Sequence, residues 1–299
     1  MLKIIRYIFN KLLHPADTLR ALRLRADMRW MMLSNLFGWS SVVSEGSGPV
    51  VSLTTYGKRA QGVYLAIESI ARGNTLPSRL ILWLDDGALY ANLPKPLLRL
   101  KRRGLEIRFC KNYGPHKKYY PYVESQNIFT SPLVTADDDV IYPRSWLAGL
   151  LAAHRQFPGY VNCYRARVMM LHAGKIAPYR EWPLCASTLP SYRTVATGVS
   201  GVIYPIALLE HLKLAGTDFE SRCPKADDLW LHVQAIRSGF HIRQIQPEPI
   251  HFPMIPGSQE TSLYAENCAQ EDGNDRQLAV TYEARDLELF RPNAVTVTA

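Results

Sequence analysis

Apolar and polar positions beyond residue 46 follow two different periods, one typical of buried strands and the other typical of helices. Short apolar runs bounded by polar loops predict strands at 49–56, 78–86, 105–110, 132–143 and 161–170. Between them, apolar residues spaced three or four apart predict helices at 62–73, 91–104 and 145–158. Such alternation of strands and helices is typical of an α/β domain with a mainly parallel sheet. We therefore expect one α/β domain over residues 46–299.

Residues 1–45 follow a different pattern and predict a separate helical arm, in which Pro15 separates two helices. The first 39 residues hold seven Lys and Arg against two Asp, so they carry +5 of the net charge of +9. Basic amphipathic helices with Trp and Phe are suited to an anionic bilayer, because their apolar face enters the headgroup boundary. The alternative is an arm that packs on the domain or on a second subunit of a homodimer.

Composition narrows the class of protein. An apolar content of 47% with 20% charged residues is typical of a globular chain. Five cysteines without a CxxC pair indicate free thiols in a reducing compartment. No apolar run reaches the length of a transmembrane helix, and the N-terminus lacks the cleavage site of a signal peptide. These features predict a cytoplasmic protein that binds the inner face of the cell membrane peripherally.

Three adjacent carboxylates, Asp137, Asp138 and Asp139, directly follow the apolar run of the strand predicted at 132–143. Like charges this close repel one another unless a cation or full solvation compensates them. Mg²⁺ and Mn²⁺ bind carboxylate oxygens and bridge to substrate phosphates. At a strand end, Asp137 and Asp139 can face one pocket, which predicts a divalent metal site; the alternative is a solvated acidic turn.

A second acidic pair, Asp227 and Asp228, begins an amphipathic helix. One of these carboxylates can serve as a general base beside an acceptor hydroxyl. The alternative is that both simply complement the helix dipole.

Several other residues favour a phosphate or sugar ligand. Gly198 and Gly201 allow the backbone to approach a ligand, or else form a turn. Lys117 and Lys118 stand in an aromatic stretch suited to a diphosphate or to sugar stacking, with an exposed loop as the alternative. His251 follows a predicted strand and is a candidate metal ligand, although a lone histidine is often structural.

In their order and spacing, these segments resemble bacterial glycosyltransferases of the GT-A fold, of the family 2-like, surface-polysaccharide type. The resemblance covers roughly residues 49–280 and does not reach the arm. Its matching pieces are SLTTYGKR (52–59), LILWLDD (80–86), HKKYYPYVE (116–124), VTADDDVIYPRSWL (134–147), YRAR (164–167), ATGVSGVIYP (196–205), CPKADDLWLH (223–232) and GNDRQL (273–278). Gly57 stands where the family usually has proline, which loosens that loop.

The resemblance implies a Rossmann-like, three-layer α/β/α sheet, the fold of nucleotide-diphospho-sugar transferases. It also implies a metal-dependent transfer of a sugar, from a nucleotide-sugar such as a UDP-sugar to a lipid-linked or oligosaccharide acceptor. The expected setting is the synthesis of lipopolysaccharide, capsule or a related glycan.

The resemblance further implies roles for single residues. Asp137 and Asp139 match the DxD motif, which holds Mn²⁺ or Mg²⁺ and the donor, and Asp138 lies between them. Asp228, paired with Asp227, would be the general base of an inverting transfer, although inversion and retention both stay open. The remaining residues expected to contact the nucleotide-sugar are Thr54, Tyr56, Arg59, Asp85 or Asp86, Lys118, Gly198 and Gly201.

Two other classes of protein remain as alternatives. A nucleotidyltransferase also uses metal-bound acids, but SLTTYGKR (52–59) is a poor match to its Gly-rich basic signature. A non-catalytic basic protein that binds membranes or nucleic acid would explain the charge. However, the surplus charge concentrates in the arm and no nucleic-acid-binding motif is present, so we expect no nucleic-acid partner.

Overall fold

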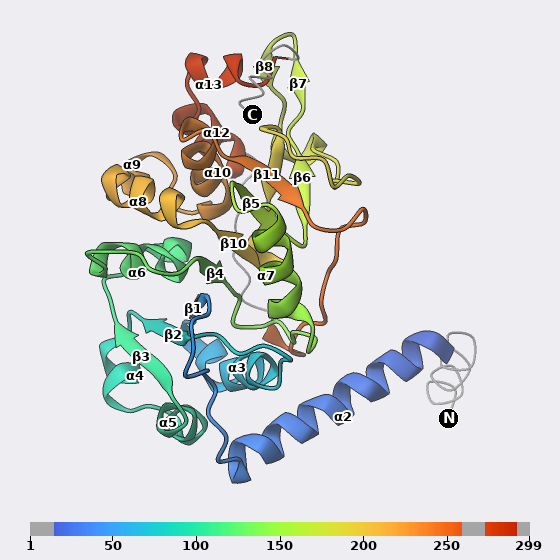
Figure 1. Ribbon diagram of the computed structural model, residues 1–299, viewed down its shortest axis with the longest axis vertical. Coiled ribbons are helices and arrows are strands. Elements are labelled where there is room, and N and C mark those ends of the chain that lie inside the picture. Colours follow the sequence, from blue (N-terminus) through green and yellow to red (C-terminus); the bar gives the residue numbers. More distant parts are fainter. Residues whose placement is uncertain (1–14, 259–272, 292–299) are drawn as a thin grey trace.

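The computed structural model describes residues 15–258 and 273–291, and its centre is a seven-stranded sheet (Figure 1). The strand order is β11-β5-β10-β4-β1-β2-β3. These strands are β1 (Val50–Thr54), β2 (Arg79–Leu84), β3 (Leu105–Phe109), β4 (Leu133–Thr135), β5 (Tyr160–Cys163), β10 (Val202–Tyr204) and β11 (His241–Gln244). β10 runs antiparallel to β4 and β5, while the other pairs are parallel. The predicted mainly parallel sheet is confirmed.

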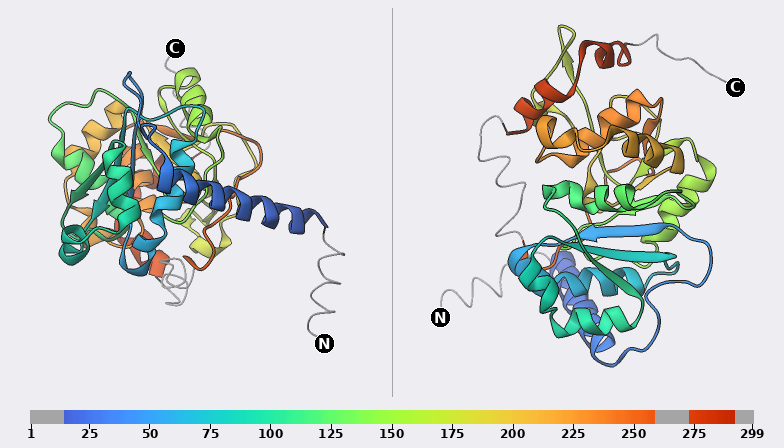
Figure 2. Two further views of the ribbon diagram at one scale, coloured as in Figure 1. Left: turned by 90° about the horizontal axis from the view of Figure 1, so that it is seen from below. Right: turned by 90° about the vertical axis from the view of Figure 1, so that its left-hand side faces the viewer.

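Helices cover both faces of this sheet, and alternate strand residues enter two different cores. In β1, Val51 and Leu53 belong to one core, whereas Val50 belongs to the other. The first core includes α3 (Val63–Ala71), α5 (Lys95–Arg102) and α7 (Trp146–Gln156). The second includes α6 (Tyr120–Ser125), α8 (Ile206–Ala215) and α10 (Asp227–Arg237). Strands buried on both faces need continuous apolar runs, which explains the apolar runs that predicted these strands. With helices on both faces, the domain has the expected three-layer α/β/α architecture (Figure 2).

Shorter elements complete the described chain. Two small sheets pair β6 (Ala166–Val168) with β9 (Thr194–Ala196) and β7 (Leu171–His172) with β8 (Lys175–Ile176). The short helices are α4 (Gly87–Ala91), α9 (Phe219–Arg222), α12 (Gly273–Thr281) and α13 (Ala284–Glu288). The 3-10 helices are η1 (Gly57–Gln61), η2 (Gly114–Lys118), η3 (Tyr179–Glu181) and η4 (Gly198–Ser200).

Three predicted elements were wrong in their extent. The strand expected at 132–143 is β4, which ends at Thr135 before the acidic turn. The helix expected at 91–104 is α5 alone, because Pro94 precedes it and α4 has already ended at Ala91. The strand expected at 161–170 divides into β5 and β6, which belong to different sheets. The apolar run continues across this break, so periodicity alone gave no sign of it.

The helix α2 (Pro15–Phe37) packs one face on α3 and α5 and extends away from the sheet (Figures 1 and 2). Met31 is buried with Leu65 and Ala66 of α3, and Asp27 forms an ion pair of 2.8 Å with Arg72. The helix begins at Pro15. The helix predicted before Pro15 lies outside the described residues.

No helix in residues 15–258 or 273–291 is long and apolar enough to cross a bilayer. The described cysteines, Cys110, Cys163, Cys185 and Cys223, are buried free thiols, as the sequence predicts. Cys268 lies outside the described residues.

Candidate functional site

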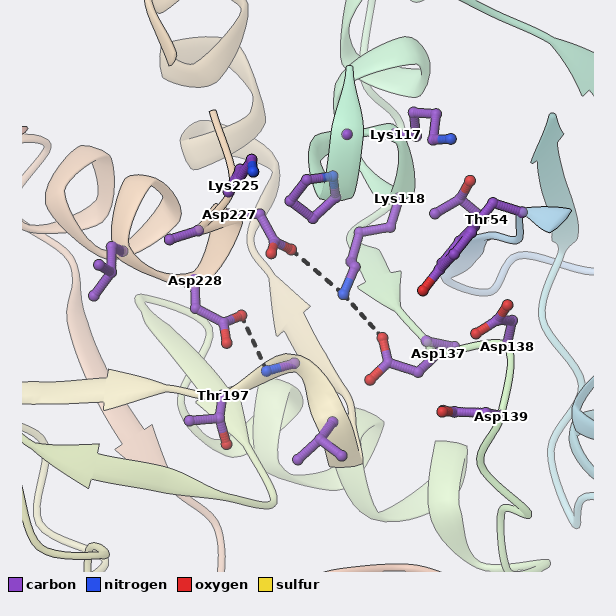
Figure 3. A pocket seen from close by; sticks show the side chains of 18 of the residues that line it. Thr54, Lys117, Lys118, Asp137, Asp138, Asp139, Thr197, Lys225, Asp227 and Asp228 are labelled. Carbon is purple, nitrogen blue, oxygen red and sulfur yellow. Dashed lines mark hydrogen bonds and ion pairs between the residues drawn. The ribbon is translucent and has the colours of Figure 1, made fainter. Parts of the chain in front are cut away.

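A pocket of about 700 Å³ opens at the carboxyl ends of three neighbouring strands (Figure 3). Thr54 is the last residue of β1, Asp85 directly follows β2, and the acidic segment Asp137–Asp139 follows β4. The carboxyl ends of parallel strands meet at one edge of a sheet, which is where α/β folds bind ligands. The pocket therefore lies where the fold favours a ligand site.

Arg59 holds two of the three acids that follow β4. This side chain comes from η1, which begins soon after β1 ends, so it reaches across the edge of the sheet. One guanidinium nitrogen lies 2.9 Å from Asp138 Oδ1, and the other terminal nitrogen contacts Asp139. Thr55 donates a hydrogen bond of 2.6 Å to the second oxygen of Asp138. The acidic turn is therefore compensated by protein groups and is not simply solvated.

Burial makes these acids hard to ionise. It raises the pKa of Asp138 to about 6, against the opposing effects of Arg59 and Thr55. Burial also raises the pKa of Asp139, and the negative charge of Asp137 adds to the rise. A further cation that enters the pocket would stabilise the ionised form of these carboxylates.

Lys118 connects the acidic turn to the second acidic pair. Its Nζ lies 2.9 Å from Asp137 Oδ1 and 3.4 Å from Asp227 Oδ2 (Figure 3). Burial alone would lower the pKa of Lys118, but the carboxylates of Asp137, Asp227 and Asp228 outweigh burial and hold that pKa well above its ordinary value. Two segments that are far apart in the sequence thus share one cation, whose side chain is 14% exposed.

Asp227 and Asp228 occupy the first turn of α10, as predicted, and both line the pocket. Asp228 Oδ1 accepts a hydrogen bond of 3.0 Å from the backbone N–H of Gly198. Burial raises the pKa of Asp228 to about 8; Asp227 adds to the rise and Lys118 opposes it. Oδ2 of Asp227 is buried and accepts no hydrogen bond from the described residues. Asp228 can therefore hold or accept a proton near neutral pH.

The two candidate glycines have different surroundings. Gly198 lines the pocket, and a Cβ built on it would lie 3.2 Å from Asp228 Oδ1 and 3.3 Å from Lys118 Nζ. Gly201 is not among the residues that line it. Gly201 has φ +96°, and its Cβ position lies 2.6 Å from the indole nitrogen of Trp146. The expected ligand role of Gly201 is therefore corrected to a packing role, since Trp146 leaves no room for a side chain.

The structure also separates Asp85 from Asp86. Asp85 lines the pocket and forms an ion pair of 2.6 Å with the buried Lys117. Asp86 is absent from the lining and caps α4, where it accepts the N–H groups of Ala88 at 2.9 Å and Leu89 at 3.0 Å. Asp86 is thus corrected to a helix cap.

His251 reaches the pocket through a pairing between distant segments. Val140 and Met254 form an antiparallel bridge, and Ile141 N–H donates to the carbonyl of Pro253 at 2.8 Å. This pairing lays the segment that follows β11 beside the acidic turn, and His251 lines the same pocket as Asp137 and Asp139.

The acidic turn fits a divalent metal only in part. Within the described ranges, no three His, Cys, Asp or Glu side chains gather closely enough to hold a metal ion. Mg²⁺ sites at phosphate substrates usually combine one or two carboxylates with phosphate oxygens and water. Asp139 is buried and Asp137 is partly exposed, and because both line the pocket they can supply that share of the ligands. The donor set therefore fits a metal ion that a diphosphate helps to hold.

The remaining candidates, Thr54 and Tyr56, also line the pocket, and the Arg59 guanidinium lies 5.4 Å from the Tyr56 ring centre. The pocket also has lining residues that the sequence pattern did not indicate as site residues: Asn112, Arg165, Arg167, Tyr179, Thr197, Lys225 and Asn274. The YRAR segment and Lys225, beside Asp227, were visible as motif neighbours. Nothing in the local pattern marks Tyr179.

No protein-family model matches the sequence, and no curated protein is significantly similar to it. Solved structures are similar in fold. The mannosyltransferase PcManGT from Pyrobaculum calidifontis, in complex with GDP-Man and Mn²⁺, is 13% identical, with a TM-score of 0.51 over 88% of this chain and 74% of that one. TarS 1–349 from S. aureus is 15% identical, with a TM-score of 0.47 over 81% of this chain and 68% of that one.

A third structure, CMP:2-keto-3-deoxy-manno-octonic acid synthetase with CTP, is 14% identical with a TM-score of 0.43 over 75% of this chain and 100% of that one. The TM-scores of TarS and of the synthetase both lie below 0.5. The likeness to the mannosyltransferase, with a TM-score above 0.5, extends over most of both chains. The chain thus has the GT-A-like α/β fold that its motifs predict.

Proposed function

We propose that this protein is a metal-dependent glycosyltransferase that moves a sugar from a nucleotide-sugar to a membrane-associated glycan acceptor. One observation carries the proposal. Within a single pocket, Lys118 links the acidic turn after β4 to the acidic pair that begins α10. The pocket thus holds two acidic centres, one suited to a diphosphate with its cation and one suited to proton transfer.

The donor would bind on the side of β1, β2 and β4. Asp137 and Asp139 would hold Mn²⁺ or Mg²⁺, which as a Lewis acid neutralises charge on the leaving diphosphate. Thr54, Tyr56 and Asp85 would line the nucleotide. A UDP-sugar is the donor expected from the resemblance. The PcManGT complex contains GDP-Man, so GDP-sugars are equally worth testing.

The acceptor would bind on the side of α10. Asp228 would take the proton of the acceptor hydroxyl as the new glycosidic bond forms and the bond to the diphosphate breaks. Its hydrogen bond from Gly198 fixes the carboxylate, and the buried Asp227 adds negative charge that makes Asp228 a stronger base. This geometry supports an inverting transfer.

The acceptor and the cell location complete the proposal. We place the enzyme on the cytoplasmic face of the membrane, where lipopolysaccharide, capsule or similar glycans are built. Two features support this placement: the N-terminal segment of the protein is basic, and the described cysteines of the protein are free thiols.

A panel of UDP-, GDP- and CMP-sugars tests the function. The purified protein is incubated with each donor and Mn²⁺, with and without EDTA, and the phosphate products are separated by chromatography. We expect one donor to release its nucleotide in a reaction that EDTA stops. Release of pyrophosphate from a nucleoside triphosphate would instead identify a nucleotidyltransferase. No release and no calorimetric binding of any nucleotide would show a non-catalytic protein.

A further inference from the structure

The helix α2 has a second apolar face, which points away from the domain. With 100° per residue, Leu22, Trp30, Leu33 and Phe37 fall on one side of the helix, opposite the buried Met31. Their exposed fractions are 52%, 60%, 51% and 71%. Nothing in residues 15–258 or 273–291 covers this stripe. One apolar face of α2 thus packs on the domain, and a second one is exposed.

Hydrogen bonds and ion pairs hold the face of α2 that contacts the domain. The exposed outer face of α2 therefore has a fixed direction. Asn35 donates to the buried Glu68 of α3 at 3.0 Å and accepts from Arg99 of α5 at 2.9 Å. Arg103 in turn pairs with Glu68 at 2.5 Å. Because these bonds lock α2 to two helices of the domain, the helix cannot rotate to bury its outer stripe without breaking them.

Basic side chains flank the exposed stripe on both sides. Arg25 and Arg29 project along one edge, and Arg23 projects along the other. All three are exposed, and no acidic side chain of the described chain forms an ion pair with them. The acid of this stretch, Asp27, faces the domain instead, where it pairs with Arg72.

This arrangement favours an anionic lipid surface over a second copy of the chain. Two copies joined through the stripe would bring their arginines together without acids to compensate them, which is unfavourable. A bilayer accepts the apolar stripe below its headgroups and pairs the flanking arginines with lipid phosphates. Trp30, Phe37 and Trp39, the last of them 94% exposed, are side chains that the headgroup region favours.

We propose that the outer face of α2 docks the protein flat on an anionic bilayer, with the apolar stripe in the headgroup boundary and Arg23, Arg25 and Arg29 on lipid phosphates. The proposal concerns binding alone, so it stands whether or not the pocket transfers a sugar.

Flotation of the full-length protein with vesicles tests this docking. Wild type is compared on phosphatidylcholine vesicles and on vesicles that also contain phosphatidylglycerol. We expect binding to the anionic vesicles that weakens with salt. Since each basic residue near such a surface contributes roughly fivefold, the double variant Arg23→Glu/Arg29→Glu should bind more than about 20-fold more weakly. The variant Trp30→Ser/Phe37→Ser should lose binding by a similar factor.

Two control variants carry the same types of substitution at exposed positions outside α2. Arg155→Glu/Lys175→Glu has the same change in net charge, and Ile128→Ser/Leu189→Ser removes two exposed apolar side chains. Both should bind the vesicles like wild type. Wild type that does not bind anionic vesicles, or α2 variants that bind no more weakly than these controls, would overturn the proposal. A dimer in light scattering that only Trp30→Ser/Phe37→Ser dissociates would overturn it too, because the stripe would then be a protein interface.

Discussion

Lys118 Nζ lies 2.9 Å from Oδ1 of Asp137, so the lysine of η2 is in contact with the acidic turn that follows β4. The same nitrogen lies 3.4 Å from Asp227 at the start of α10. Within the pocket, this lysine is the cation that faces both acidic segments at once. In the proposed function, its charge would influence metal and diphosphate on one side and proton transfer on the other.

Replacement of this lysine should impair proton transfer more than folding. In Lys118→Met, Asp228 loses a neighbouring positive charge, so the pKa of Asp228 should rise further. Turnover at neutral pH should fall by at least about tenfold, since one pKa unit changes the ionised fraction by that factor. Part of the loss should be recovered at higher pH. A pH series of nucleotide release measures this, with the exposed Lys111→Met as control. An unchanged pH profile would contradict the role of Lys118.

The pH dependence of the wild type follows from Asp228. Its pKa is raised to about 8, and the general base must be ionised to accept a proton. We expect kcat/KM to rise with pH, to reach half its maximum at about pH 8 and to level off above that value. A kcat/KM that falls as the pH is raised from about 6 to about 8 would exclude ionised Asp228 as the base.

The same raised pKa affects stability in the opposite sense. The folded protein keeps a proton on Asp228 that the unfolded chain releases near its ordinary pKa of about 4. The contribution of Asp228 to stability is therefore complete below pH ~4 and is lost as pH rises toward ~8. Urea unfolding should show that Asp228→Asn gains stability relative to wild type as pH increases through this window. An equal difference at all pH values would contradict the raised pKa.

The two glycines should separate activity from stability. In Gly198→Ala, the new methyl group meets Asp228 and Lys118, so turnover should fall by about tenfold or more while thermal stability changes little. In Gly201→Ala, the methyl group meets Trp146 at a positive φ, and stability should fall by about 1–3 kcal/mol. Gly46→Ala, which meets nothing, is the control for both. The reverse pattern of losses would show that the roles are exchanged.

The anchor of α2 should be a major contributor to stability. Glu68 is 2% exposed, and Arg103→Met would leave its carboxylate buried without its ionic partner. Breaking a buried pair in this way costs about 3–5 kcal/mol. Urea unfolding measures the loss, and the exposed neighbour Arg102→Met should change stability by less than about 0.5 kcal/mol. Similar effects of both substitutions would mean that the network does not hold α2.

The sequence was sufficient for features that depend on neighbours along the chain. The turn Asp137–Asp139 directly follows an apolar run, so its place at a strand end was predictable. The acidic start of α10 was predictable for the same reason, since helix periodicity begins there. Asp86 was misassigned although a local signal existed: aspartate is a preferred N-cap, and α4 begins at the next residue.

Other features depend on pairings between distant segments, which no local pattern reveals. His251 lines the pocket because Met254 pairs with Val140. The chain turns out of the sheet after Cys163 because β6 pairs with β9. Likewise, the apolar pattern of α2 cannot tell which of two apolar faces the domain covers. Lys118 was expected to contact a diphosphate, and its contact with two carboxylates emerges only from the tertiary structure.

The proposed reaction assigns two tasks to one pocket: the acidic turn holds the donor, and Asp228 activates the acceptor. The most direct test measures turnover and donor affinity together in Asp228→Asn, by nucleotide release and by calorimetry. We predict that turnover falls by about 10²–10⁴-fold while the donor Kd stays near that of wild type. Near-normal turnover in Asp228→Asn, with the loss found instead in Asp227→Asn, would contradict this assignment.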